Sequence, residues 1–140
     1  GICWDQWFPE TARCLGLQGA EILFYPTAIG SEPIHPDNDT RDHWRTCMQG
    51  HAGANMVPVV ASNRTGTETI GDASITFYGS SFITDNKGAV VKRMDRISEG
   101  TISAAFDLKQ LANERRAWGL FRDRRPSHYG AILTSDGMPR

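Results

Sequence analysis

The chain has 140 residues, of which 39% are hydrophobic and 22% charged, and its 15 basic and 16 acidic residues leave a formal net charge of −1. This length suits one domain with a sizeable core, and the composition excludes a disordered, collagen-like or disulfide-stapled chain. Without a basic surplus, no charge pattern points to nucleic acid or an anionic membrane as a partner. No apolar stretch of the sequence approaches the ~20 residues that a membrane span needs.

Cysteine usage points to a reducing compartment. Cys3, Cys14 and Cys47 are odd in number and scattered, which does not make a disulfide framework. We therefore predict a cytoplasmic location with at least one thiol free for packing or chemistry. The chain opens with Gly1-Ile2-Cys3 and no Met, so we expect a fragment whose N-terminal part is missing, and a targeting segment upstream stays open.

The first half of the chain alternates strand and helix patterns. Residues 1–4 predict the end of a buried strand, and the apolar spacing from Phe8 to Leu15, with Pro9 in the first turn, predicts a helix that stops near Gly19. The elements expected next are an apolar strand over 21–28, a loop over 29–38, a helix capped by Asp39 or Thr40 that ends by Asn55, and a buried strand over 56–63.

The second half predicts local strand pairing. The polar, Gly-rich residues 65–72 predict a surface loop. After it we expect short strands over 74–78, 81–84 and 89–94, a turn over 85–88, a strand over 101–108, a helix over 108–120 and an extended tail over 122–140. The pattern predicts a single partial α/β domain over 1–140, with a mixed sheet covered by helices. Such a sheet leaves one face unmatched, which again suggests missing chain or a partner.

Cys3 is the candidate nucleophile. It lies where a predicted strand turns into a helix, which exposes its side chain at the sheet edge. A following helix aims its free N–H groups and the positive end of its dipole at the thiol, and both favour the reactive thiolate. The position alone leaves a buried structural cysteine as the alternative. Packing explains Cys14 and Cys47 better than catalysis.

These residues carry a family resemblance. Residues 2–10 (ICWDQWFPE) resemble the nucleophile segment of the nitrilase superfamily of carbon–nitrogen hydrolases, in which a cysteine at a strand-to-helix elbow precedes an aromatic residue, an aspartate and a Phe-Pro-Glu box. The ordered match continues over nearly the whole chain. It is closest to the plant-type N-carbamoylputrescine amidases, through residues 2–10, 24–33 (FYPTAIGSEP) and 49–55 (QGHAGAN). The resemblance implies the C-terminal part of an α-β-β-α sandwich, with helices on one face of a mixed sheet.

The resemblance also implies a mechanism without a cofactor. The family's cysteine attacks the carbamoyl carbon, a glutamate accepts the thiol proton, and a lysine with the backbone N–H after the cysteine stabilises the oxyanion. Here that N–H belongs to Trp4. The family's glutamate and lysine precede its cysteine, and Glu10 and Glu32 match other positions. We therefore expect the chain alone to be inactive.

The implied substrate is a small ureido molecule, N-carbamoylputrescine, in polyamine biosynthesis. Its ammonium end needs an acidic or aromatic partner, and we assign Glu32 to it; a solvated loop carboxylate is the alternative. Trp4, Trp7 and Ala28 are expected to line the channel, although packing explains Trp7 equally well. The alternative substrates are those of a β-ureidopropionase-like or ω-amidase-like enzyme.

Four further residues are expected to support the site without reacting. Asp5 is expected to anchor the elbow by hydrogen bonds, and Glu10 to do similar work at the helix start. Asn63 and Arg64 follow the 56–63 strand, where ordinary strand-end hydrogen bonds are the alternative.

Two other functions compete with catalysis. His43, Cys47 and His51 share a helix face, but the first and last are eight residues apart, about 12 Å along a helix, which is too far for one tetrahedral ion. We predict no metal site. The second rival is a non-catalytic module that forms homo-oligomers through residues 115–140, as family members assemble through helices and C-terminal tails.

Overall fold

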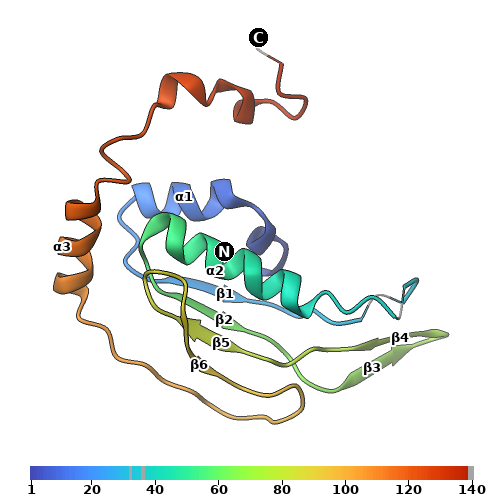
Figure 1. Cartoon of the computed structure of the whole chain (residues 1–140). Coiled ribbons are helices and arrows are strands. Elements are labelled where there is room, and N and C mark those ends of the chain that lie inside the picture. Colours follow the sequence, from blue (N-terminus) through green and yellow to red (C-terminus); the bar gives the residue numbers. More distant parts are fainter. Residues whose placement is uncertain (32, 36, 139–140) are drawn as a thin grey trace.

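The computed structural model, which describes residues 1–31, 33–35 and 37–138, is built on a four-stranded mixed sheet (Figure 1). Its strands are ordered β1 (Leu23–Pro26), β2 (Val59–Ser62), β5 (Phe82–Thr84) and β6 (Val90–Arg93). β1 and β2 are parallel, and the two following pairs are antiparallel. A helical crossover separates β1 from β2, as parallel strands require, whereas a short turn joins β5 to β6.

Two helices, α1 (Pro9–Leu17) and α2 (Arg41–Asn55), cover the same face of this sheet (Figure 1). Strand alternation directs Leu23 and Tyr25 of β1 toward the helices, whereas Phe24, on the opposite face, is 58% exposed. The core between the layers consists of Ala12, Leu23, Tyr25, Trp44, Met48, Ala52, Val57, Val59, Ala61 and Phe82. The predicted mixed sheet with helices on one face is confirmed.

Local residues mark both ends of α1 and the start of α2. Pro9 opens α1, and Gly19 in a left-handed conformation (φ 95°) follows its end. Thr40 occupies the N-cap of α2, but it is the Asp39 carboxylate that accepts a hydrogen bond from the Arg41 N–H at 3.0 Å. None of the helices in the described ranges is long and apolar enough to cross a bilayer.

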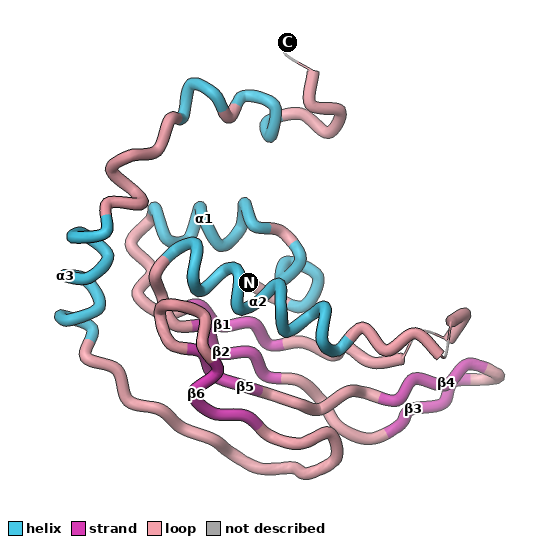
Figure 2. The backbone as a smooth tube through the Cα atoms, viewed as in Figure 1, coloured by secondary structure: helices cyan, strands magenta, loops and turns pink. Residues whose placement is uncertain are grey.

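The surface loop predicted over residues 65–72 is largely wrong. A two-stranded antiparallel ribbon, β3 (Thr67–Ile70) and β4 (Ala73–Thr76), extends beyond the main sheet (Figure 2). The hydroxyls of Thr67 and Thr76 lie 2.9 Å apart across it. Every side chain of β3 is exposed, so the strand lacks the apolar alternation that marks a half-buried strand.

Two further predictions fail after β6. Residues 101–107 form no regular element, so the strand predicted over 101–108 is wrong. Helix α3 (Leu108–Trp118) is present, and its N-cap Asp107 accepts a hydrogen bond from the Gln110 N–H at 3.0 Å. The tail is not simply extended, because it contains the 3-10 helices η2 (Pro126–His128) and η3 (Gly130–Leu133) and leads away from the sheet (Figure 1).

Candidate active site

Cys3 does not follow a strand as predicted. Gly1 and Ile2 are exposed and form no strand, and Cys3 opens a five-residue 3-10 helix, η1 (Cys3–Trp7). Helix α1 begins only at Pro9, so the long helix does not start at the thiol. The correction has a physical reason: a strand is held by a ladder of paired backbone hydrogen bonds. Among the described residues, the contact of Gly1 and Ile2 with β1 is a single hydrogen bond, from the Gly1 nitrogen to the Phe24 carbonyl at 3.2 Å.

The backbone at Cys3 is nevertheless a sharp elbow. Cys3 has φ 49°, a left-handed conformation that costs a residue with a Cβ on the order of 1–3 kcal/mol. The Asp5 carboxylate holds the turn by accepting a hydrogen bond from the Ile2 N–H at 2.9 Å, and the Asp5 N–H donates to the Ile2 carbonyl at 3.2 Å. Asp5 therefore makes the elbow contacts expected of it; its effect on the reaction stays a prediction.

The thiol lies beside the carboxyl ends of β1 and β2. Thr27 follows β1, and its N–H donates to the Ser62 carbonyl of β2 at 2.8 Å. The Thr27 hydroxyl lies 3.6 Å from the sulfur of Cys3, which is exposed. This end of the sheet thus presents an accessible thiol next to a hydroxyl.

A buried polar network lies behind this contact. Gln6 of η1 is 1% exposed, and its amide nitrogen lies 3.0 Å from the Thr27 hydroxyl oxygen. The indole N–H of Trp44 donates to the amide oxygen of Gln6 at 2.7 Å, and His51 Nε2 lies 2.8 Å from the Gln6 carbonyl oxygen. Neither Gln6 nor Thr27 is among the predicted site residues. Both lie within segments quoted for the family resemblance, but nothing in the sequence shows that they meet.

The predicted channel residues divide into two groups. Trp4 is 69% exposed and directly follows the thiol, and Ala28 is an exposed residue directly after Thr27. Trp7 packs between η1 and α2: its ring centroid is 6.3 Å from that of Trp4, edge to face, and 4.9 Å from that of His43. It also lines a cavity of about 760 Å³ between α1, α2 and the tail. Packing between helices accounts for this position of Trp7. Glu32 lies outside the described residues.

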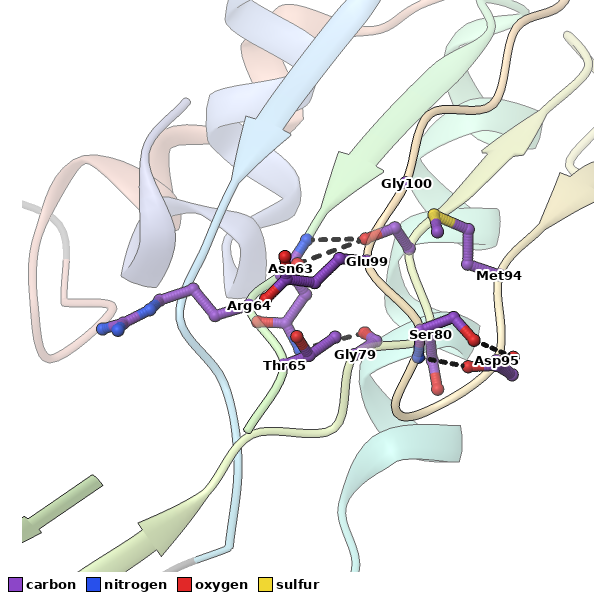
Figure 3. Close-up of a pocket in the computed structure, with 11 residues that line it drawn as sticks. Asn63, Arg64, Thr65, Gly79, Ser80, Met94, Asp95, Glu99 and Gly100 are labelled. Atoms are coloured by element: carbon purple, nitrogen blue, oxygen red, sulfur yellow. Dashed lines mark hydrogen bonds between the residues drawn. The ribbon is translucent and has the colours of Figure 1, made fainter. Parts of the chain in front are cut away.

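Among the described residues, no contact brings Glu10 or Arg64 to the thiol. Glu10, in the first turn of α1, lines the same cavity as Trp7. Arg64 stacks over the Phe77 ring at 4.5 Å and pairs with Glu68 of β3, and its guanidinium is turned away from the other labelled residues in Figure 3. Arg64 thus supports the β3–β4 ribbon.

Asn63 ties together three segments at the end of β2. Its side-chain oxygen accepts a hydrogen bond from the Ile29 N–H at 2.9 Å, and its side-chain nitrogen donates to the carbonyls of Ile29 and Gly79 at 2.9 and 3.1 Å. Its own N–H donates to the Ser81 hydroxyl at 2.9 Å, beside a pocket of about 360 Å³ (Figure 3). Asn63 therefore holds the loop that carries Ala28, without touching the thiol.

The residues weighed for a metal site have other partners. The ring of His43 packs at a tilt against that of Trp7, and His51 contacts the Gln6 carbonyl. Cys47 is half-buried, and burial raises the pKa of its thiol. Among the described residues, no three His, Cys, Asp or Glu side chains are grouped so that they could hold a metal ion.

Comparison with known proteins identifies the family. A family model described as "Carbon-nitrogen hydrolase" matches residues 1–116. The chain belongs to the carbon–nitrogen hydrolase family. A crystal structure of a carbon–nitrogen hydrolase from Helicobacter pylori G27 is 38% identical, with a TM-score of 0.83 over 96% of this chain and 48% of that one. The Caenorhabditis elegans NitFhit protein is 29% identical, with a TM-score of 0.74 over 92% of this chain and 29% of that one.

Among curated relatives, an N-carbamoylputrescine amidase of Arabidopsis thaliana is 60% identical over 97% of this chain and 47% of the relative. A citrullinase of Francisella tularensis is 59% identical over 95% of this chain and 46% of the relative. The chain thus spans about half the length of the curated relatives that it matches. The assignment of Cys3 as the nucleophile stays a prediction.

Proposed function

We propose that this chain supplies the cysteine nucleophile of an enzyme that hydrolyses N-carbamoylputrescine. The observation that carries the proposal is the exposed thiol of Cys3 on a strained elbow, in a chain of the carbon–nitrogen hydrolase family. The names of relatives at 60% and 59% identity, an N-carbamoylputrescine amidase and a citrullinase, support a ureido group as the target.

The proposed reaction has two covalent steps. The sulfur of Cys3 attacks the ureido carbon, and the tetrahedral adduct loses ammonia, which leaves an alkylcarbamoyl group on sulfur. Water then cleaves this thiocarbamate, restores the thiol and releases a carbamic acid, which decomposes to putrescine and CO2. The thiol proton passes to a base and then to the departing ammonia. We assign that base to a glutamate in a segment outside this chain, together with a lysine.

The backbone N–H of Trp4 is the proposed oxyanion donor. Trp4 is the second residue of η1, and N–H groups in the first turn of a helix have no partner within the helix. An N–H one residue after the nucleophile is thus free to meet the oxygen that becomes charged during attack.

The substrate class separates this proposal from its rivals. N-carbamoylputrescine ends in an ammonium, citrulline in an amino acid group, and N-carbamoyl-β-alanine in a carboxylate. Glu32 is the proposed ammonium partner, because a carboxylate attracts the first and repels the last. A cytoplasmic location and a role in polyamine biosynthesis belong to the same proposal.

A chimera tests this assignment. The portion of the Arabidopsis relative that this chain does not match is joined ahead of Gly1, and ammonia release is measured with the three ureido compounds. We expect N-carbamoylputrescine to react fastest, and Glu32→Gln to raise its KM about tenfold or more with little change in kcat. Preference for citrulline or N-carbamoyl-β-alanine would contradict the substrate, and a fall in kcat alone would contradict the role of Glu32.

A further inference from the structure

A chain of hydrogen bonds joins the helix layer of the core to the thiol of Cys3. It runs from the indole nitrogen of Trp44 to the side chain of Gln6 (2.7 Å), from Gln6 to the Thr27 hydroxyl (3.0 Å), and from Thr27 to the Cys3 sulfur (3.6 Å). Trp44 is fully buried and Gln6 is 1% exposed. A buried amide that makes two directed side-chain bonds has one orientation, so this network is rigid at its inner end.

The direction of each hydrogen bond follows from the chemistry of the groups. An indole nitrogen only donates, so the atom of Gln6 that faces Trp44 is its oxygen. The amide nitrogen of Gln6 therefore faces Thr27, and since it only donates, the Thr27 oxygen accepts. The hydroxyl hydrogen of Thr27 is then left to donate, and the Cys3 sulfur lies within reach at 3.6 Å.

The two middle residues of this hydrogen-bond chain, Gln6 and Thr27, are held independently of the thiol. The backbone N–H of Thr27 bonds to the Ser62 carbonyl, so β2 sets the position of Thr27. The carbonyl oxygen of Gln6 lies 2.8 Å from Nε2 of His51, which is 5% exposed, so α2 sets the position of Gln6. The hydroxyl is thus held by the sheet and the helix layer, and Cys3 meets it at the elbow.

We propose that Thr27 is a positioning residue that donates a hydrogen bond to the Cys3 sulfur, with its hydroxyl oriented by Gln6 and Trp44. A hydrogen bond to the charged form of a group favours that form, so this donor stabilises the thiolate, which is the nucleophile. Its role in hydrolysis rests on the proposed function. Its effect on the thiol does not, because alkylation of Cys3 requires only the thiolate.

The test compares variants that keep or remove the donor. Thr27→Val keeps the shape and β-branching of the half-buried side chain without its hydroxyl, and Thr27→Ser keeps the hydroxyl. The rate of alkylation by iodoacetamide is measured for each cysteine by peptide mass spectrometry across pH. The exposed Cys14 of α1 is the internal reference.

We expect Thr27→Val to slow the alkylation of Cys3 about tenfold at neutral pH, because the thiolate loses a hydrogen-bond donor. Thr27→Ser is expected to react close to the wild-type rate, and Cys14 to be unchanged throughout. Thr27→Ala, which adds no methyl group next to the elbow, is the second variant without a hydroxyl if Thr27→Val fails to fold.

The titratable groups on the elements around the elbow are the same in all these variants. They are the Gly1 ammonium and Asp5 beside the elbow, Tyr25 of β1, Glu10 of α1, and His43 and His51 of α2. An unchanged Cys3 profile in folded Thr27→Val or Thr27→Ala would overturn the proposal, as would an equal slowing in Thr27→Ser. A slower alkylation of Cys3 together with an inactive chimera would leave the proposal standing and reject the proposed function.

Discussion

The left-handed backbone at Cys3 is the residue-scale feature on which the site depends. A Cβ at φ 49° is unfavourable, and the Asp5 carboxylate maintains the elbow by accepting a hydrogen bond from the Ile2 N–H. The pattern of an aspartate two residues after a cysteine gave the resemblance its first segment. The strain itself cannot be predicted from the sequence, because a cysteine does not indicate a positive φ as a glycine often does.

Tyr25 is the second residue that lowers the stability of the fold. It is fully buried in β1, and its hydroxyl has no hydrogen-bond partner within the described residues. Burial, and secondarily the negative charge of Asp5, raise the pKa of Tyr25 from its usual value of 10.0 to about 12. The folded state therefore holds the Tyr25 proton to higher pH than the unfolded state does.

The raised pKa of Tyr25 predicts a loss of stability at alkaline pH, which Tyr25→Phe should remove. Below pH 10 both the folded and the unfolded state hold the Tyr25 proton, so the free energy of unfolding does not depend on this group. From about pH 10 to 12 the unfolded state ionises first, so the free energy of unfolding of the wild type falls by about 3 kcal/mol. Tyr25→Phe is expected to abolish this contribution to the alkaline loss of stability. At pH 7 we expect the substitution to leave the free energy of unfolding unchanged or to raise it, since it removes an unpaired polar group. Urea denaturation at pH 7, 10 and 11 measures the difference; parallel pH curves would contradict it.

At the scale of elements, α2 is held to the sheet layer by the β5–β6 turn. The Gln49 amide nitrogen donates to the Gly88 carbonyl at 2.7 Å. Gly88 has φ 88°, and a Cβ there would lie 2.6 Å from the Gln49 carbonyl oxygen. Only a glycine fits so close to the helix backbone.

Gly88→Ala should therefore lower the free energy of unfolding by more than the backbone strain of a left-handed residue alone. Gly66 is the matched control, because it has φ 86° but open space around a built Cβ. We expect Gly66→Ala to lose about 1–2 kcal/mol from the left-handed conformation and Gly88→Ala to lose about 1–3 kcal/mol more from the clash. Chemical denaturation of the two variants measures this, and equal losses would show that the turn does not press on α2.

Sequence patterns predicted elements where burial is one-sided. The helix started by Pro9 and the strand containing Leu23 and Tyr25 have one apolar face, and both are present. β3 was missed because all of its side chains are exposed. The loose alternation after residue 100 was mistaken for a strand, since alternation reports which side chains could be buried, not whether a neighbouring strand pairs with them.

Long-range contacts set a similar limit for the site. Cys3, Trp4 and Ala28 were named from the sequence and lie at the same end of β1. Gln6 and Thr27 were not, because Trp44, which fixes the orientation of Gln6, is 38 residues away from it and the contact depends on how α2 packs over the sheet. The packing of α2 over the sheet cannot be predicted from the local sequence around Gln6 and Thr27.

Across the whole molecule, exposed apolar side chains mark two surfaces. Phe24 lies on the sheet face opposite the helices, and Trp118, Leu133 and Met138 lie on α3 and the tail. α3 has no buried residue and is joined to the rest by polar contacts, such as the hydrogen bond from Arg115 to the Ala20 carbonyl. Homo-oligomer formation through this region stays a prediction, which sizing the chain with and without residues 122–140 tests.

The proposed function depends on covalent chemistry at Cys3. The chimera is incubated with N-carbamoylputrescine, quenched in acid during turnover, and digested for mass measurement of the peptides that carry Cys3, Cys14 and Cys47. We predict an alkylcarbamoyl group on Cys3 alone, which disappears when substrate is exhausted, and no putrescine release by Cys3→Ser. Sustained putrescine release by Cys3→Ser, or the group on Cys14 or Cys47, would contradict the account.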